Sequence, residues 1–327
     1  MGKIANFGET QDVEITVLVD NRADLLVKSA DTVKRFFKKP LLAEHGFAAL
    51  VDLKDAGTRI LWDAGMTETV LLENARRMEI DLGQVDKIAL SHGHADHYTA
   101  MAGVISQSSR LPGLREWDKD ASLEEIHAYV SGRRTPLIAH PAAFRERWNT
   151  GKDGKRHGPS LVPRQEWVAA GAEIVQAEGP TQLAPGCWTT GYVPRTSFEK
   201  AGIPPRRSYR QGDTFIPDQL EDDQSIVINL RGKGLVVLTG CAHAGVINTI
   251  RYARQISGVD RIWAILGGFH LAPAGEEDIQ RTIDAIQDLE PALVAPTHCS
   301  GFKAIGEFAR QMPAAFVEGA VGTRYLF

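Results

Sequence analysis

The sequence predicts an α/β protein in which β-sheets pack against each other and helices cover their outer faces. Two observations support this fold class. Short apolar runs typical of strands alternate with amphipathic segments typical of helices, and this order occurs in both halves of the 327-residue chain. The composition is that of an ordinary globular protein, with 43% hydrophobic and 24% charged residues, and the length is enough to bury a large core.

The first ninety residues contain four runs with the apolar, β-branched composition of strands. Gly57 lies between two of them and permits a hairpin turn. One further segment has apolar residues at helical spacing, and Thr67 can cap its beginning. The expected strands are 14–20, 47–53, 58–63 and 87–90, and the expected helix is 67–79.

The C-terminal half repeats this order of strands and helices. Each expected strand is a short apolar run, and each expected helix has an apolar face at helical spacing. The expected strands are 225–230, 234–238, 261–266, 293–296 and 321–327, and the expected helices are 245–256 and 276–289.

Two polar stretches interrupt the pattern and are interpreted as insertions. Residues 106–134 are charged, are broken by Pro112 and Gly113, and contain one expected helix at 122–130. They form either a lid over a site or a plain surface excursion. Residues 196–224 contain several prolines and are expected to be irregular. The basic residues of this second stretch are Arg206, Arg207 and Arg210.

The bulk properties exclude several classes of partner. A net charge of -4 requires no strongly basic face, which argues against nucleic acid. The sequence has no apolar signal segment at its start and no apolar stretch long enough to span a bilayer. The cysteines Cys187, Cys241 and Cys299 are too scattered for a disulfide framework. We therefore expect a cytoplasmic protein with reduced thiols and a small-molecule substrate, and we leave its oligomeric state open.

The most specific signal is the run His92-Gly93-His94-Ala95-Asp96-His97, directly after an expected strand. Two histidines two residues apart on a loop can turn their imidazoles to one side and bind one metal ion. Asp96 and His97 then point toward a neighbouring position, so that one segment supplies ligands for two ions. Imidazole and carboxylate suit zinc, iron or manganese. We expect one or two divalent ions here, with zinc as the first candidate.

Three further strand ends carry histidine or cysteine. Cys241 and His243 follow one strand, His270 follows the next, and His298 and Cys299 follow a third. A single histidine after a strand is usually structural, but several at equivalent places indicate convergence on the first cluster. For either cysteine, the alternative is a small buried apolar residue.

On these residues the sequence resembles the metallo-β-lactamase-fold superfamily, in which His-x-His-x-Asp-His is the signature. More narrowly, it resembles the branch named for 7,8-dihydropterin-6-methyl-4-(β-D-ribofuranosyl)aminobenzene-5'-phosphate synthase. The resemblance covers nearly the whole chain. The matching segments are Val19–Asn21, Glu44–Gly46, Leu61–Gly65, Thr190–Gly191, Gly240–Gly245, Gly267–Leu271 and His298–Gly301.

The resemblance implies one domain over residues 1–327 with the two insertions named above. It implies a four-layer αββα sandwich of two mixed sheets, with the site at one edge between them. The ligands that it implies are His92 and His94 for one metal position, and Asp96, His97 and His298 for the other.

Two departures from the family pattern affect the first metal position. Thr189–Arg195 has no histidine where the superfamily usually supplies one. The usual Gly-Asp element with its bridging aspartate is replaced by Gly240-Cys241. Either Cys241 or His243 takes over as a ligand, or one metal position is weak or empty. A thiolate would favour zinc or iron over magnesium.

Side chains around the implied metals have expected roles. Asp96 is expected to be both a ligand and the proton acceptor from an activated water, and Asp63 either orients a ligating histidine or caps a turn. The residues expected to bind substrate are Asp20, Asn21, His45, Arg195 and His270. His45 has a structural role under Gly46 as its alternative.

The remaining basic and histidine side chains have two interpretations. Arg195 and the arginines of 196–224 either grip an anionic substrate or are solvated surface residues. The histidines interpreted as structural or superficial are His127, His140 and His157.

Three functions remain open from the sequence. The first is a metal-dependent hydrolase acting on an ester, lactone or phosphoester of a small molecule. The second is a synthase that condenses a pterin with a ribofuranosyl-aminobenzene phosphate. The third is a non-catalytic metal-binding sensor, supported by the missing histidine and opposed by the intact Asp96-His97 pair.

Overall fold

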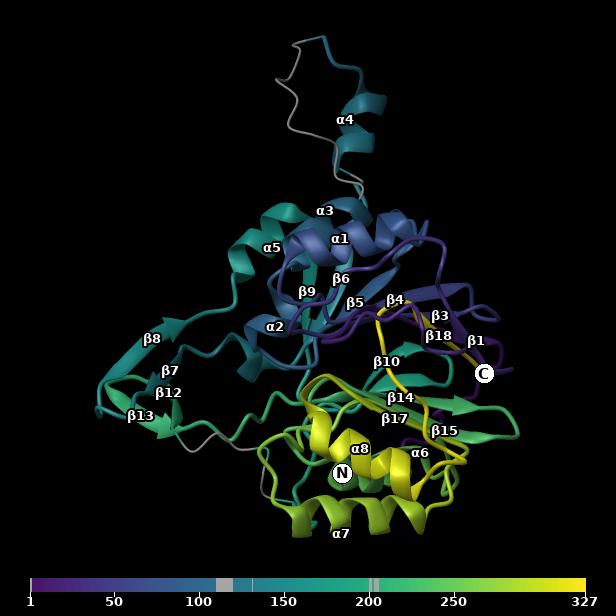
Figure 1. Cartoon of the computed structure of the whole chain (residues 1–327). Helices are drawn as coiled ribbons and strands as arrows, with labels where there is room; N and C mark the ends of the chain where they lie inside the picture. Colours follow the sequence, from purple (N-terminus) through teal and green to yellow (C-terminus); the bar gives the residue numbers. More distant parts are fainter. Residues whose placement is uncertain (1, 110–119, 131, 200–201, 203–205) are drawn as a thin grey trace.

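Two β-sheets pack face to face and carry helices on their outer sides, which makes four layers (Figure 1). The computed structural model describes residues 2–109, 120–130, 132–199, 202 and 206–327. The predicted αββα sandwich is confirmed. Among the described helices, none combines the length and the apolar character needed to cross a bilayer.

The first sheet has eight strands in the order β2-β18-β1-β3-β4-β5-β6-β9. Its first five strands pair antiparallel, whereas β4, β5, β6 and β9 run parallel, so the ends of β4 and β5 meet at one edge. The strands are β1 (Val13–Val19), β2 (Val33–Arg35), β3 (Ala48–Leu53), β4 (Thr58–Trp62), β5 (Lys87–Ala89), β6 (Thr135–Ala139), β9 (Ala172–Gln176) and β18 (Thr323–Leu326).

The second sheet has six strands in the order β10-β11-β14-β15-β16-β17. Strands β15, β16 and β17 are parallel, so their ends also lie along one edge. The strands are β10 (Thr181–Ala184), β11 (Cys187–Thr189), β14 (Ser225–Leu230), β15 (Gly234–Thr239), β16 (Ile262–Gly268) and β17 (Leu293–Thr297).

Helices cover each sheet on one face only (Figure 1). The first sheet is covered by α1 (Glu68–Arg77), α3 (Met101–Ser108) and α5 (Arg164–Ala170). The second is covered by α6 (Val246–Ser257), α7 (Glu276–Gln287) and α8 (Phe302–Gln311). All predicted strands and helices outside the insertions agree with the structure to within two residues at each end.

Successive residues of the central strands alternate between two apolar layers. In β15, Val236 and Leu238 pack between the sheets, while Leu235 and Val237 pack under the helices. A strand buried on both faces needs a continuous apolar run, and this run is the signal that predicted it.

A third sheet of four strands contradicts the prediction that residues 196–224 are irregular. It has the order β13-β12-β7-β8 and extends from the side of the sandwich where α2 (Ala95–Tyr98) lies (Figure 1). Its strands are too polar to show apolar alternation, and cation–π stacking of Arg145 on Tyr209 at 4.2 Å supports them instead. The strands are β7 (Arg147–Thr150), β8 (Arg156–Ser160), β12 (Arg207–Gln211) and β13 (Thr214–Pro217).

The insertion at 106–134 contains the predicted helix, α4 (Leu123–Val130). In Figure 1, α4 stands beyond α3, on the outer side of the helix layer and away from α2. As drawn, α4 therefore does not form a lid over the histidine run. Residues 110–119 and 131 of this insertion, and 200–201 and 203–205 of the second, lie outside the described residues.

The buried Arg147 joins the third sheet to the sandwich. Its guanidinium pairs with Asp218 at 2.7 Å and Asp222 at 2.5 Å, and all three side chains are almost fully buried. It also donates to the carbonyl oxygens of Ala143 at 3.3 Å and Gly93 at 3.4 Å. One cation therefore neutralises two carboxylates next to the histidine run.

Replacing this cation should destabilise the whole fold. Arg147→Ala leaves two carboxylates buried without a partner, which typically costs about 3–5 kcal/mol of unfolding free energy. Urea denaturation measures this cost, and Lys155→Ala, an exposed change near the same sheet, should stay within about 0.5 kcal/mol of the unmodified protein. An Arg147→Ala protein as stable as that control would contradict the assigned role.

Candidate metal centre

The predicted ligands come together at one edge of the sandwich. The run 92–97 follows β5, Cys241 and His243 follow β15, and His298 follows β17. Parallel strands end at the same edge, so segments about 150 and 200 residues apart in sequence meet there.

Several of the turns that make this edge hold non-glycine residues in the left-handed region. The φ angles are 58° at Asp63, 53° at Ala242, 47° at His270 and 48° at His298. Such angles cost free energy in a non-glycine residue and persist where the surrounding contacts enforce them. The clustering of four of them marks this edge as a functional region.

A first ligand group consists of His92, His94 and His243, whose ligand-type nitrogens lie within 4.8 Å of one another. The Nδ1 of His94 lies 3.2 Å from the Nε2 of His243, close to the ~3.3 Å separation of two nitrogens on one tetrahedral zinc ion. His243 donates from Nδ1 to the carbonyl of Gly202 at 2.8 Å, which leaves Nε2 free to bind a metal.

Burial keeps the first group neutral. It lowers the pKa of His92, His94 and His243 well below the usual value, and neighbouring histidines lower it further. The Nε2 atoms of His92 and His94 are buried without a hydrogen-bond partner. Neutral imidazoles with free nitrogens fit a metal ion.

A second ligand group consists of Asp96, His97 and His298. Asp96 Oδ2 lies 3.7 Å from His97 Nε2 and 3.4 Å from His298 Nε2. Cys241 Sγ lies 3.1 Å from His97 Nε2, and Cys241 also clusters with His243 and His270. The thiol therefore stands between the two groups. Burial raises its pKa well above the usual value, so a metal ion is needed to hold it as a thiolate.

Asp63 and Ser91 orient the histidines. Asp63 is fully buried, and its Oδ2 accepts a 2.6 Å hydrogen bond from His97 Nδ1, which leaves His97 Nε2 directed at Cys241. Ser91 donates to both oxygens of Asp63 at 2.7 Å and its hydroxyl lies 2.9 Å from His92 Nδ1. Burial alone would lower the pKa of His97, but Asp63 and Asp96 raise it to about 9.

Asp20 is predicted at the site mouth, and this placement is wrong. Its carboxylate is 1% exposed and accepts hydrogen bonds from Thr297 Oγ1 and from the backbone nitrogens of Asn21 and His298. It therefore holds the turn after β17. Asn21 accepts from His298 Nδ1 at 2.9 Å and so directs the His298 Nε2 toward Asp96. The hydrogen bonds of Asp20 and Asn21 therefore position the candidate ligand His298.

The other predicted substrate-binding residues have different surroundings. His45 is exposed, lies 3.3 Å from Asp96 Oδ2, and stands at the mouth. Arg195 Nη2 donates to the carbonyl of His243 at 3.4 Å. The ring of His270 lies 4.1 Å from that of His243, so it joins the potential ligands rather than the mouth.

The sequence analysis left Asp222 and Ser91 out of the site, and it placed Cys299 near the first cluster without assigning it a role. Cys299 clusters with Cys241 and His298, and Asp222 accepts from the Gly93 nitrogen at 2.7 Å. Ser91 immediately precedes the histidine run, and that position was the available signal. Asp222 lies in the acidic run Glu221-Asp222-Asp223, which is typical of a solvated surface.

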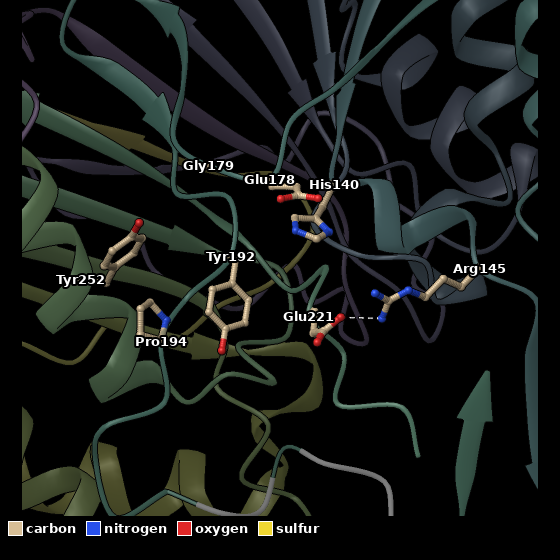
Figure 2. Close-up of a pocket in the computed structure, with 8 residues that line it drawn as sticks. All are labelled: His140, Arg145, Glu178, Gly179, Tyr192, Pro194, Glu221 and Tyr252. Carbon is tan, nitrogen blue, oxygen red and sulfur yellow. Dashed lines mark ion pairs between the residues drawn. The ribbon is translucent and has the colours of Figure 1, made fainter. Parts of the chain in front are cut away.

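A cavity of about 550 Å³ lies apart from the ligand groups. Figure 2 shows its eight lining residues, none of which belongs to either group. His140 and Tyr192 face it, and Glu221 pairs with Arg145 at 2.6 Å on one wall. Because Glu221 adjoins Asp222, the cavity shares a loop with the metal centre. His157 is exposed on the third sheet, as predicted.

Comparison with known proteins agrees with this geometry. Residues 43–187 match the model of the metallo-beta-lactamase superfamily. The crystal structure of Tm1679, a metal-dependent hydrolase of the β-lactamase superfamily, aligns with a TM-score of 0.68 and 23% identity, over 95% of this chain and 98% of that one. The protein has the metallo-β-lactamase fold. The predicted resemblance is confirmed.

Two proteins from Methanocaldococcus jannaschii are similar in sequence to this chain. One, 7,8-dihydropterin-6-methyl-4-(beta-D-ribofuranosyl)-aminobenzene-5'-phosphate synthase, is 26% identical over 96% of this chain and 96% of its own. The other, the uncharacterized protein MJ0448, is 29% identical over 94% of this chain and 98% of its own. Both alignments span nearly the full length.

Metal addition and removal should change the stability of this metallo-β-lactamase fold. Zinc that binds the folded state alone adds about 2.7 kcal/mol at a concentration of 100 times its Kd. We expect zinc to raise Tm, chelator to lower it, and His97→Ala to reduce bound metal measured by plasma mass spectrometry. His157→Ala, on the exposed third sheet, should behave as the unmodified protein. Equal metal content in the His97→Ala and unmodified proteins would argue against the site.

Asp63→Asn should lower the affinity of the centre for metal, although it leaves every candidate ligand in place. Loss of the carboxylate that orients His97 typically lowers metal affinity by about 10–100-fold. Competition titration with a chromophoric chelator measures this affinity, and Asp31→Asn, an exposed aspartate, serves as the control. An unchanged affinity would show that Asp63 only caps its turn.

Proposed function

We propose that this protein is a metal-dependent hydrolase in which an activated water attacks an ester, lactone or phosphoester bond of a small molecule. The observation that carries the proposal is the pair of ligand groups that meet at Cys241, with buried imidazole nitrogens that have no partner in the described part of the chain. A divalent metal bound by these side chains lowers the pKa of water to about 7, and so supplies hydroxide near neutral pH.

The donor set favours zinc or iron over magnesium, and we propose zinc as the metal. Both groups combine imidazole with the thiol of Cys241 or the carboxylate of Asp96. Thiolate and imidazole suit zinc or iron, whereas magnesium prefers oxygen ligands. We propose that His243, which lies close to His92 and His94, completes the first group in place of the histidine that the segment 189–195 lacks.

Asp96 is the proposed proton acceptor. Burial would raise its pKa, but His97 and His298 hold the pKa of Asp96 well below its usual range, so it is a carboxylate at neutral pH. Its side chain is 17% exposed, more than those of its two histidine neighbours, and faces the mouth. His45, 3.3 Å away and 64% exposed, can exchange a proton between Asp96 and solvent.

The remaining side chains keep this arrangement rigid. Asp63 and Asn21 each accept the Nδ1 proton of a ligand histidine, so His97 and His298 direct Nε2 inward. Fixed orientation of catalytic groups removes the need for reorganisation during the reaction.

Turnover of a substrate panel tests the hydrolase. Zinc-loaded protein should hydrolyse at least one of an aryl phosphodiester, an aryl ester and a lactone. Asp96→Asn should lower kcat by about 10²–10⁴-fold, the usual contribution of proton transfer, in protein whose metal content has been measured. His157→Ala should retain the activity. A zinc-loaded protein inactive on the whole panel, or an Asp96→Asn protein of full activity, would contradict the proposal.

A second candidate, condensation of a pterin with a ribofuranosyl-aminobenzene phosphate, is supported by one observation. A relative named as the corresponding synthase is 26% identical over 96% of this chain. Mass spectrometry of a reaction that contains both substrates separates the two functions. A condensed product formed without hydrolysis of the panel would favour the synthase.

A further inference from the structure

Arg207 is a half-buried cation without an anionic partner among the described residues. Its Nη1 is buried and makes no hydrogen bond, and its Nε only donates to Asn149 Oδ1 at 3.3 Å. Two other arginines of the third sheet are paired with carboxylates: Arg147 binds two aspartates, and Arg210 lies 3.8 Å from Asp213. Partial burial of an unpaired charge is unfavourable. An anion from outside the chain could bind the Arg207 guanidinium and compensate for this cost.

The strand register directs Arg207 toward the metal centre. In the antiparallel pair of β12 and β7, Arg207 lies opposite Asn149 and Tyr209 lies opposite Arg147. Opposite residues and residues two apart share a face, so Arg207 and Arg147 project from the same side of the sheet. Arg147 reaches the carbonyl of Gly93, between His92 and His94. That side of the sheet therefore faces the first ligand group, on the flank where Figure 1 places α2.

The surroundings of Arg207 disfavour its charge. Burial, and after it the neighbouring Arg147, lower the pKa of Arg207, and the carboxylates of Asp218, Asp222 and Asp96 only partly oppose this shift. An anion bound to the guanidinium would favour its charged form.

Neighbouring arginines are less suited to this role. Arg206 is exposed, and Arg210 alternates to the opposite face of β12 and is paired. Arg195 already donates to the backbone of His243. Arg195 Nε is also buried without a partner, but Arg195 does not belong to the third sheet. Among the described arginines of that sheet, Arg207 combines a buried nitrogen that makes no hydrogen bond with the face toward the ligands.

We propose that Arg207 binds an oxyanion, a phosphate or a carboxylate, that forms part of the substrate held at the metal centre. The proposal rests on the hydrolase function for its substrate and narrows that substrate to anionic molecules. A planar guanidinium can donate two parallel hydrogen bonds to such a group, while Asn149 fixes its Nε side.

Binding of inorganic phosphate tests this without any turnover. Isothermal titration calorimetry is performed on zinc-loaded protein of measured metal content, with acetate as a second titrant to separate phosphate from carboxylate recognition. Arg207→Ala should weaken binding of the preferred anion by about 10–100-fold, as expected for loss of a charged hydrogen bond. Arg207→Lys should retain more anion affinity than Arg207→Ala, because lysine keeps the positive charge but lacks the paired N–H donors of the guanidinium.

Arg210→Ala is the matched control, since it removes a charge from the same strand on the opposite face. Three results would overturn the proposal. These are no binding of either anion to the unmodified protein, equal weakening by Arg210→Ala, and a loss of zinc in Arg207→Ala that accounts for the weaker binding. Because the titration needs no hydrolysis, an inactive protein that binds phosphate through Arg207 would sink the hydrolase proposal and leave the anion site in place.

Discussion

The metal centre depends on one buried carboxylate, that of Asp63. It lies at the end of β4 in a left-handed conformation. It accepts hydrogen bonds from Ser91, in the segment after β5, and from His97, in α2. Three separate pieces of chain are thus held together by two oxygen atoms. Because the carboxylate is fully buried, its own energy depends on keeping all of those donors. The hydrogen bonds that the Asp63 carboxylate must accept therefore fix the positions of the ligands.

The sandwich could be predicted because its central strands are buried on both faces. Runs such as Leu235 to Leu238 are continuously apolar, and this pattern does not occur in a surface strand. The third sheet could not be predicted in the same way. Residues such as Arg207 and Arg210 alternate with polar neighbours, and the strands are held by arginine stacking and by the buried Arg147, contacts between positions more than fifty residues apart.

The candidate ligands could be predicted from their local context, since each histidine follows a strand that ends at the same edge. What each neighbour does could not. Asp20 and Asn21 look like mouth residues in the sequence, and only the turn at His298 shows that they support a ligand from beneath. Similarly, the orientation of the His243 ring toward the first group depends on the hydrogen bond from its Nδ1 to the carbonyl of Gly202, which no spacing rule reveals.

Gly202 also bears on how sequence variation in this chain is interpreted. A side-chain carbon added there would collide with the backbone of His243, and the same residue supplies the carbonyl that holds the His243 ring. A change at this position is therefore a change to the ligand geometry, although Gly202 lies in a proline-rich stretch and far along the chain from the histidine signature. Variants at Gly202 belong with variants of the ligands themselves, and a survey confined to histidine, cysteine and aspartate would overlook them.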